Sequence, residues 1–306
     1  MLRSVILAAS RDERVKGIVA GAPVSRAVVA RFVAGERDED AVRAARDLLG
    51  QGLTVTLDRL GEDVLDAGQA AAAVRACVGL VRRLADAGLT AEGRTELSVK
   101  LSAFGQAFDE ALALDGARQV CAAARDAGTT VTLDMEDSST TDSTLGILRS
   151  LRADFPWVGA VLQAYLRRTE GDCRDLAHAG SRVRLCKGAY SEPASVAYQG
   201  TDEVDRSYVR CLRVLMAGDG YPMVATHDPR LVAIATHLAA SRAPGSYEMQ
   251  MLYGVRPQEQ LRLSAEGRTV RVYVPYGDEW YGYLMRRLAE RPANVVFFLR
   301  ALRSRS

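Results

Sequence analysis

Lysine is scarce in this chain of 306 residues, although basic side chains are common. Of the 40 basic residues three are lysines, namely Lys16, Lys100 and Lys187. The formal net charge is +2, so the composition gives no case for nucleic acid or another acidic polymer as a partner. Because arginine carries most of the positive charge, the placement of Lys100 and Lys187 near the ends of predicted strands needs its own explanation.

Cysteine and histidine are also sparse, and their spacing argues against several kinds of site. The five cysteines form no C-x-x-C pair, which disfavours a disulfide framework or a zinc site and fits a reducing compartment. The three histidines form no H-x-H motif, so we expect no bound metal. No G-x-G-x-x-G follows a predicted strand, and no segment approaches the ~18 apolar residues of a membrane span. We expect a cytoplasmic protein that is at most peripheral on a membrane.

Eight β-like runs, each followed by a helix-like run, dominate the chain from residue 53 onward. The predicted strands are 53–58, 96–102, 130–136, 158–165, 182–188, 223–227, 247–252 and 270–274. Eight such units predict an α/β fold, a (β/α)8 barrel of the TIM type. Residues 1–50 lack strand signals and predict helices packed on the barrel of 51–306, with 1–306 as a single domain.

Polar side chains recur on one face of these strands. Side chains alternate along a strand, and in a barrel one face points to the axis. The alternation predicts that seven polar residues point inward: Asp58, Lys100, Asp134, Gln163, Arg184, Gln250 and Tyr273. An internal salt-bridge network that only fills the barrel would also explain them. We prefer a site, because burial of unpaired polar groups is costly and barrels bind ligands at the carboxyl ends of their strands.

Two adjacent arginines suggest an anionic ligand. Arg286 and Arg287 lie on the helix predicted after the last strand, and they reach one ligand only if that helix lies over the barrel mouth. A solvated helix face, with Arg286 pairing Glu290, is the alternative. Arginine forks match carboxylates in a bidentate way.

Eight short segments, in order along the chain, resemble those of bacterial single-function proline dehydrogenases. They are 99–102, 133–136, 162–168, 184–190, 225–229, 250–254, 273–277 and 286–290. The resemblance implies a distorted barrel that binds FAD non-covalently, with the last helix over the barrel mouth. It implies oxidation of L-proline to Δ1-pyrroline-5-carboxylate, the first step of proline degradation to glutamate. It also implies a quinone as electron acceptor and a peripheral position on the inner membrane.

The resemblance assigns roles to individual residues. It places the substrate carboxylate on Lys100, Arg286 and Arg287, with Asp134 orienting Lys100 and Tyr273 against the ring. It places Arg184 near flavin N5 and Gln163 against the isoalloxazine. The rest of the implied flavin site is Met135, Lys187, Gly188, Ala189, Thr226 and His227. Cys186 departs from the family pattern, in which valine is more usual.

Other functions remain open at this point. A hydroxyproline dehydrogenase and a methylenetetrahydrofolate reductase are flavin barrels as well, although the phenol of Tyr273 leaves little room for a 4-hydroxyl group. Lys100 and Lys187 lie near strand ends, where a Schiff-base aldolase carries its lysine. A non-catalytic barrel that binds an anionic metabolite is the third alternative.

Overall fold

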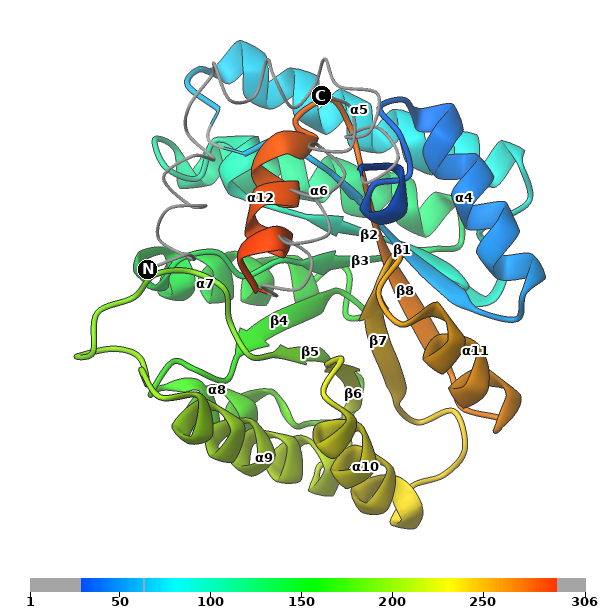
Figure 1. Cartoon of the computed structure of the whole chain (residues 1–306). Coiled ribbons are helices and arrows are strands. Elements are labelled where there is room, and N and C mark those ends of the chain that lie inside the picture. The colour runs from blue at the N-terminus through cyan, green and yellow to red at the C-terminus, as the bar shows by residue number, and fades with distance from the viewer. Residues whose placement is uncertain (1–28, 63, 291–306) are drawn as a thin grey trace, which may run out of the picture.

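A closed barrel of eight parallel strands forms the centre of the molecule (Figure 1). The computed structural model describes residues 29–62 and 64–290, and for residues 286–290 it describes the backbone alone. Each strand pairs with its neighbours in sequence, and β1 closes the barrel on β8, with Thr56 opposite Tyr273. The strands are β1 Thr54–Arg59, β2 Thr95–Val99, β3 Thr130–Leu133, β4 Gly159–Gln163, β5 Arg182–Cys186, β6 Tyr221–Ala225, β7 Glu248–Leu252 and β8 Val270–Tyr276.

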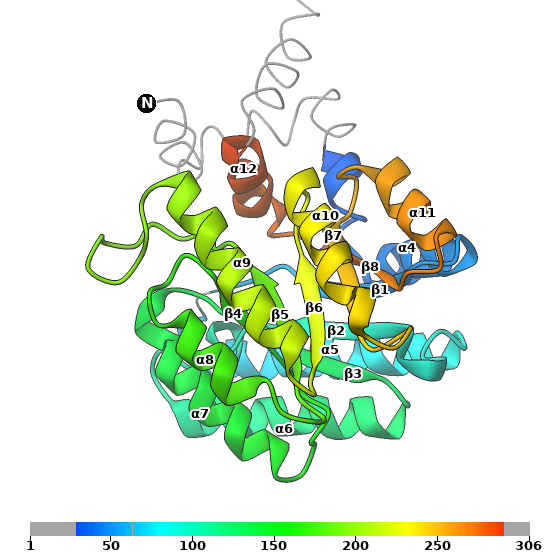
Figure 2. The same ribbon diagram turned by 90° about the horizontal axis from the view of Figure 1, so that it is seen from below.

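Helices surround the barrel, as Figures 1 and 2 show. From residue 38 onward the α-helices are α4 Asp38–Gly50, α5 Ala67–Asp86, α6 Glu110–Asp126, α7 Thr141–Arg152, α8 Thr169–Leu176, α9 Thr201–Ala217, α10 Pro229–Leu238, α11 Pro257–Ala265 and α12 Trp280–Glu290. Short 3-10 turns occupy Ala91–Gly93, Ser102–Phe104, Ser138–Thr140 and Ala239–Ser241. Aspartates begin several helices, for example Asp66, which accepts a hydrogen bond from the backbone of Gln69 at the start of α5. The predicted (β/α)8 barrel is confirmed.

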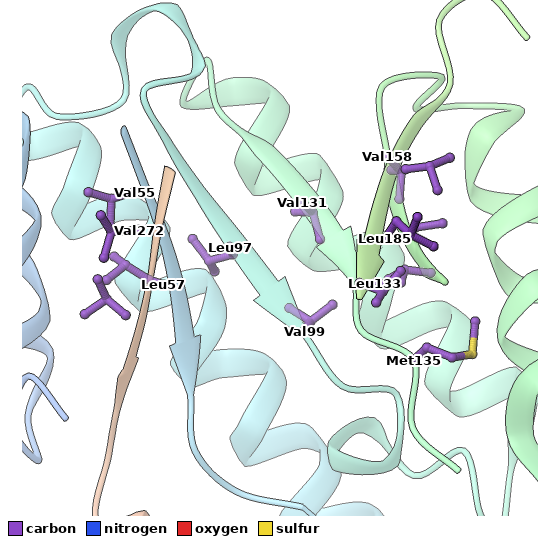
Figure 3. Packing of buried hydrophobic residues seen from close by; sticks show 14 of the residues in the cluster. Val55, Leu57, Leu97, Val99, Val131, Leu133, Met135, Val158, Leu185 and Val272 are labelled. Carbon is purple, nitrogen blue, oxygen red and sulfur yellow. The ribbon is translucent and has the colours of Figure 1, made fainter. Parts of the chain in front are cut away.

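Apolar side chains on the outer face of the strands form the main core together with the helices. Val55, Leu57, Leu97 and Val272 are fully buried there, and Figure 3 shows them on neighbouring strands. The side chains between them in sequence point into the barrel. The alternation therefore leaves the interior to polar and charged groups, as the sequence predicted.

Most strands end earlier than the sequence predicted. Lys100 follows the end of β2, Asp134 follows β3, Lys187 follows β5, and Thr226 follows β6. The predicted strands were too long because pairing stops where the neighbour stops. β3 ends at Leu133, which pairs with Val99, the last residue of β2. The polar residues at these positions lie on the loops at the carboxyl end of the barrel.

The helices α4 and α12 lie next to the strands that close the barrel, but at different places. α4 packs against β1 and β8, and its buried Ala41 and Ala45 belong to the main core. α12 instead buries Tyr281 and Leu284 against Leu60, which directly follows β1. The last helix thus lies at the carboxyl end of the barrel, as Figure 2 shows. The helices predicted for residues 1–28 lie outside the described residues, and the single-domain organisation stays a prediction.

Within the described residues no helix combines the length and the apolar character needed to cross a membrane.

Candidate active site

A hydrogen-bonded cluster occupies the carboxyl end of the barrel. The Nζ of Lys100 donates to Oδ1 of Asp58 at 2.7 Å and lies 3.6 Å from Oδ2 of Asp134. The phenol of Tyr273 donates to the same Oδ2 at 2.8 Å, and the hydroxyl of Ser98 donates to Oδ1 at 2.7 Å. Asp134 therefore holds the hydroxyl groups of Ser98 on β2 and Tyr273 on β8 close together. The hydrogen bond of Lys100 goes to Asp58, which was predicted to point inward but was given no role in the site.

Arg184 lies directly below this cluster, inside the barrel, with its side chain 5% exposed. Its guanidinium donates to Asp134 and to Glu96, each at 2.9 Å, and its Nε donates to Gln250 at 2.6 Å. The guanidinium carbon lies 5.2 Å from the centre of the Tyr273 ring, which is within cation–π range. Two carboxylates, an amide and an aromatic ring thus fix the position of Arg184.

A second charged layer below Arg184 was missed when the sequence was interpreted. Glu96 is fully buried and binds Arg182 at 2.8 Å as well as Arg184. Glu248, also fully buried, binds Arg271 at 2.8 Å. The strand alternation was a usable signal, because Arg182, Glu248 and Arg271 each lie two positions before a residue predicted to point inward, and Glu96 lies four positions before Lys100. The internal network considered as an alternative is therefore real, and it supports the upper cluster rather than replacing it.

The charges of this network balance. Four cations (Lys100, Arg182, Arg184, Arg271) are connected by ion pairs to four anions (Asp58, Glu96, Asp134, Glu248). Burial alone would raise the pKa of Glu96, but the surrounding guanidinium groups hold it well below its usual value. Burial alone would lower the pKa of Lys100, but Asp58 and Asp134 raise it. The network itself has no net charge left for an anionic ligand.

The residues predicted for a cofactor lie on β5 (Arg184), at the end of β4 (Gln163) and on the loops after β3, β5 and β6. The Nε2 of Gln163 donates to the backbone carbonyl of Met135 at 3.1 Å, while the side chain of Met135 packs into the core. Oε1 of Gln163 is buried and has no hydrogen-bond partner among the described residues. Gly188 has a φ of +107°, and a Cβ there would lie 2.2 Å from the ring of Tyr165. The contact with Tyr165 accounts for the glycine at position 188. The unpaired acceptor of Gln163 is a feature that a bound ring system would use.

The other residues predicted to bind the cofactor already have partners. Lys187 forms ion pairs with Asp205 and Asp228, and Ala189 is exposed on the loop after β5. The Nε2 of His227 accepts a hydrogen bond from the backbone of Leu252 at 2.8 Å. Asp228 donates its backbone amide to the hydroxyl of Thr226. Arg286 and Arg287 belong to α12, but their side chains lie outside the described residues.

Comparison with known proteins agrees with the sequence resemblance. The family model for proline dehydrogenase matches residues 41–300. The chain is 38% identical over 304 residues to proline dehydrogenase 1 of Bacillus subtilis (strain 168), covering 99% of each sequence. It is 39% identical over 279 residues to a proline dehydrogenase of Deinococcus radiodurans, covering 89% of each.

Solved structures show the same barrel within longer proteins. Proline utilization A (PutA) from Bdellovibrio bacteriovorus, inactivated by N-propargylglycine, matches with a TM-score of 0.78 and 25% identity over 86% of this chain and 32% of that chain. A mutant of PutA from Bradyrhizobium japonicum matches with a TM-score of 0.75 and 23% identity over 92% of this chain and 32% of that chain. The chain therefore belongs to the proline dehydrogenase family and is an oxidoreductase that acts in the first step of proline catabolism.

Proposed function

We propose that the chain oxidises L-proline to Δ1-pyrroline-5-carboxylate with non-covalently bound FAD at the carboxyl end of the barrel. The observation that carries this proposal is the family match over residues 41–300. The hydrogen-bonded cluster of Lys100, Asp134 and Tyr273 supports it, because the family resemblance assigns these residues to one substrate site.

The described residues fit a flavin in one respect. Gln163 leaves a buried acceptor for an N–H donor. We assign the flavin to Gln163, with Met135 after β3, Lys187, Gly188 and Ala189 after β5, and Thr226 and His227 after β6 around it. When bound, FAD supplies a two-electron acceptor for the hydride that leaves C5 of proline.

The substrate carboxylate needs cations beyond the balanced network. Lys100 contributes a positioned N–H donor, but its charge is already matched by Asp58 and Asp134. We therefore assign the compensating charge to Arg286 and Arg287 of α12. A carboxylate held by charged donors in this way would fix the ring against Tyr273.

The ring amine must lose its proton before its lone pair can assist hydride departure. Closure of α12 over the barrel mouth would exclude water, which favours the neutral amine and strengthens the contacts to the carboxylate. Arg184 holds a buried positive charge below Tyr273. This charge would stabilise the negative charge that a bound flavin gains when it is reduced. Asp134 positions Tyr273 and Arg184 through hydrogen bonds to both.

A quinone is the proposed electron acceptor, and a peripheral contact of this cytoplasmic protein with the inner membrane would bring the two together. Both follow from the family resemblance. Reduction of a soluble quinone analogue by the proline-reduced protein would test the acceptor. Co-sedimentation with anionic lipid vesicles would test the contact.

Anaerobic titration with L-proline, observed at the flavin absorption bands, tests the reaction. We expect the purified protein to be yellow and the bands to bleach with a limiting equivalent of proline. A colourless protein that traps a carbonyl substrate with borohydride would indicate the Schiff-base aldolase instead. Equal turnover of proline and 4-hydroxyproline would contradict the role of Tyr273 against the ring.

A further inference from the structure

We propose that Asp58 is a positioning residue that holds the ammonium group of Lys100 where it can donate to the substrate carboxylate. This inference rests on the proposed function, and it adds to that function a residue from β1 that the family segments did not include. Asp58 touches Lys100 and need not touch the substrate. Its effect on the reaction passes through the lysine.

The geometry separates Asp58 from the other carboxylates near Lys100. Oδ1 of Asp58 accepts the hydrogen bond at 2.7 Å, and the Asp58 side chain is 3% exposed. Oδ2 of Asp134 lies 3.6 Å from Nζ and already accepts from Tyr273. Oδ1 of Asp134 accepts from Ser98 and Arg184. Asp58 is therefore the carboxylate that sets the direction of the Lys100 side chain.

Several charged groups face Lys100 from different elements. They are Asp58 on β1, Asp134 after β3, Glu62 on the loop after β1, and Glu136 on the loop after β3. Glu136 accepts hydrogen bonds from the backbone and hydroxyl of Ser102, and it makes no ion pair with Lys100 within 4.0 Å. Loss of Asp58 would remove the anion at hydrogen-bonding distance, while burial would continue to disfavour the charged lysine.

The first part of the test uses three variants. Asp58→Asn removes the negative charge at similar volume, Asp58→Glu keeps the charge, and Glu136→Gln removes a buried carboxylate that does not bind Lys100. We expect Asp58→Asn to raise KM for proline about tenfold or more while kcat changes about threefold at most, since carboxylate binding is shared by ground and transition states. We expect Asp58→Glu to recover part of the loss and Glu136→Gln to leave KM within about twofold.

The second part measures how fast the amine of Lys100 is acylated. This is practical because the chain contains three lysines. Acetic anhydride acylates only unprotonated amines, and mass spectrometry can follow Lys100 separately from Lys16 and Lys187. Below the pKa of an amine its acylation rate rises about tenfold per pH unit. We expect the rate at Lys100 of the wild type to keep rising through pH 10, and the rate in Asp58→Asn to level off at least about one unit lower.

Each outcome decides the proposal. Unchanged KM and an unchanged Lys100 profile in folded Asp58→Asn would overturn it, as would equal changes in Glu136→Gln. If Asp58→Asn does not fold, the wild-type profile decides, because a rate at Lys100 that levels off below pH 10 would exclude a dominant carboxylate partner. The acylation profile needs neither flavin nor turnover. A colourless wild-type protein with the expected acylation profile would therefore refute the proposed function, while the interaction between Asp58 and Lys100 would still be supported.

Discussion

Replacement of Gly188 by alanine tests whether the contact between the loop after β5 and the Tyr165 ring shapes the flavin site proposed beside it. Gly188 has a φ of +107°, and its added Cβ would lie 2.2 Å from Cδ1 and 2.3 Å from Cε1 of Tyr165. The backbone of Tyr165 cannot easily retreat, because its amide donates to the carbonyl of Lys187 at 2.9 Å and its carbonyl accepts from Tyr198 at 2.8 Å. The Tyr165 ring, which is 7% exposed, must therefore move.

The cost has two parts that can be separated. A non-glycine residue held in this region of φ costs about 1–3 kcal/mol. Forcing a buried aromatic ring to move adds about 1–3 kcal/mol of overpacking. Gly128 offers a matched control, since it has a φ of +70° and no heavy atom within 4 Å of an added Cβ. Gly128→Ala should therefore carry the backbone cost alone, about 1 kcal/mol.

Urea unfolding and FAD titration measure the two effects. We expect Gly128→Ala to lower the free energy of unfolding by about 1 kcal/mol and to bind FAD normally. We expect Gly188→Ala to lose about 2–6 kcal/mol in total, divided between unfolding free energy and FAD affinity. Equal stability of the two variants, together with full FAD binding by Gly188→Ala, would refute the assignment of this loop to the flavin.

Three further changes test other parts of the site. Glu96→Gln should lower the free energy of unfolding at pH 7 by about 3–5 kcal/mol, because buried guanidinium groups lose their anion. The folded-state pKa of Glu96 lies below its usual 4.5, so its stabilisation is present above pH 4.5 and is lost as pH falls through the folded value. Urea unfolding should therefore show a smaller difference between the two proteins at pH 3, and a constant difference would contradict this. Arg286→Met should raise KM for proline by the equivalent of about 2–5 kcal/mol, and unchanged steady-state kinetics would refute its role. Gln163→Leu should weaken FAD binding about tenfold in a fluorescence titration, since it removes the acceptor left unpaired by the fold.

The interior of the barrel was predictable because alternation is a local property. Lys100, Arg184 and Gln250 each lie between apolar residues in sequence, and each points inward in the structure. The same rule applies to Glu96, which stands two positions before Ser98. What alternation does not specify is the partner, because that depends on which strands face each other across the barrel. Glu96 and Arg184 are 88 residues apart in sequence and 2.9 Å apart in the fold.

Strand ends were predicted less well, and the reason is non-local. A run of suitable residues continues past Leu133 into Asp134 and Met135, yet β3 ends at Leu133. The end of the strand coincides with the end of β2, whose last residue Val99 pairs with Leu133, and the residues of β3 do not encode this. The resulting loop positions matter for the site, because a side chain beyond the ladder is free of the strict alternation. Met135 accordingly presents its carbonyl to Gln163 and its side chain to the core.

The placement of α4 explains why the last helix can take part in the site. In a regular barrel the helix after the eighth strand would pack on the outside between β8 and β1. Here α4, which precedes β1, packs against both of these strands. The outer position is thus occupied before α12 is reached, and α12 packs on Leu60 at the carboxyl end instead. Because the ion pairs inside the barrel are already balanced, a substrate carboxylate needs positive charge from elsewhere. Arg286 and Arg287 belong to α12, which lies at the carboxyl end because α4 occupies the outer position beside β1 and β8.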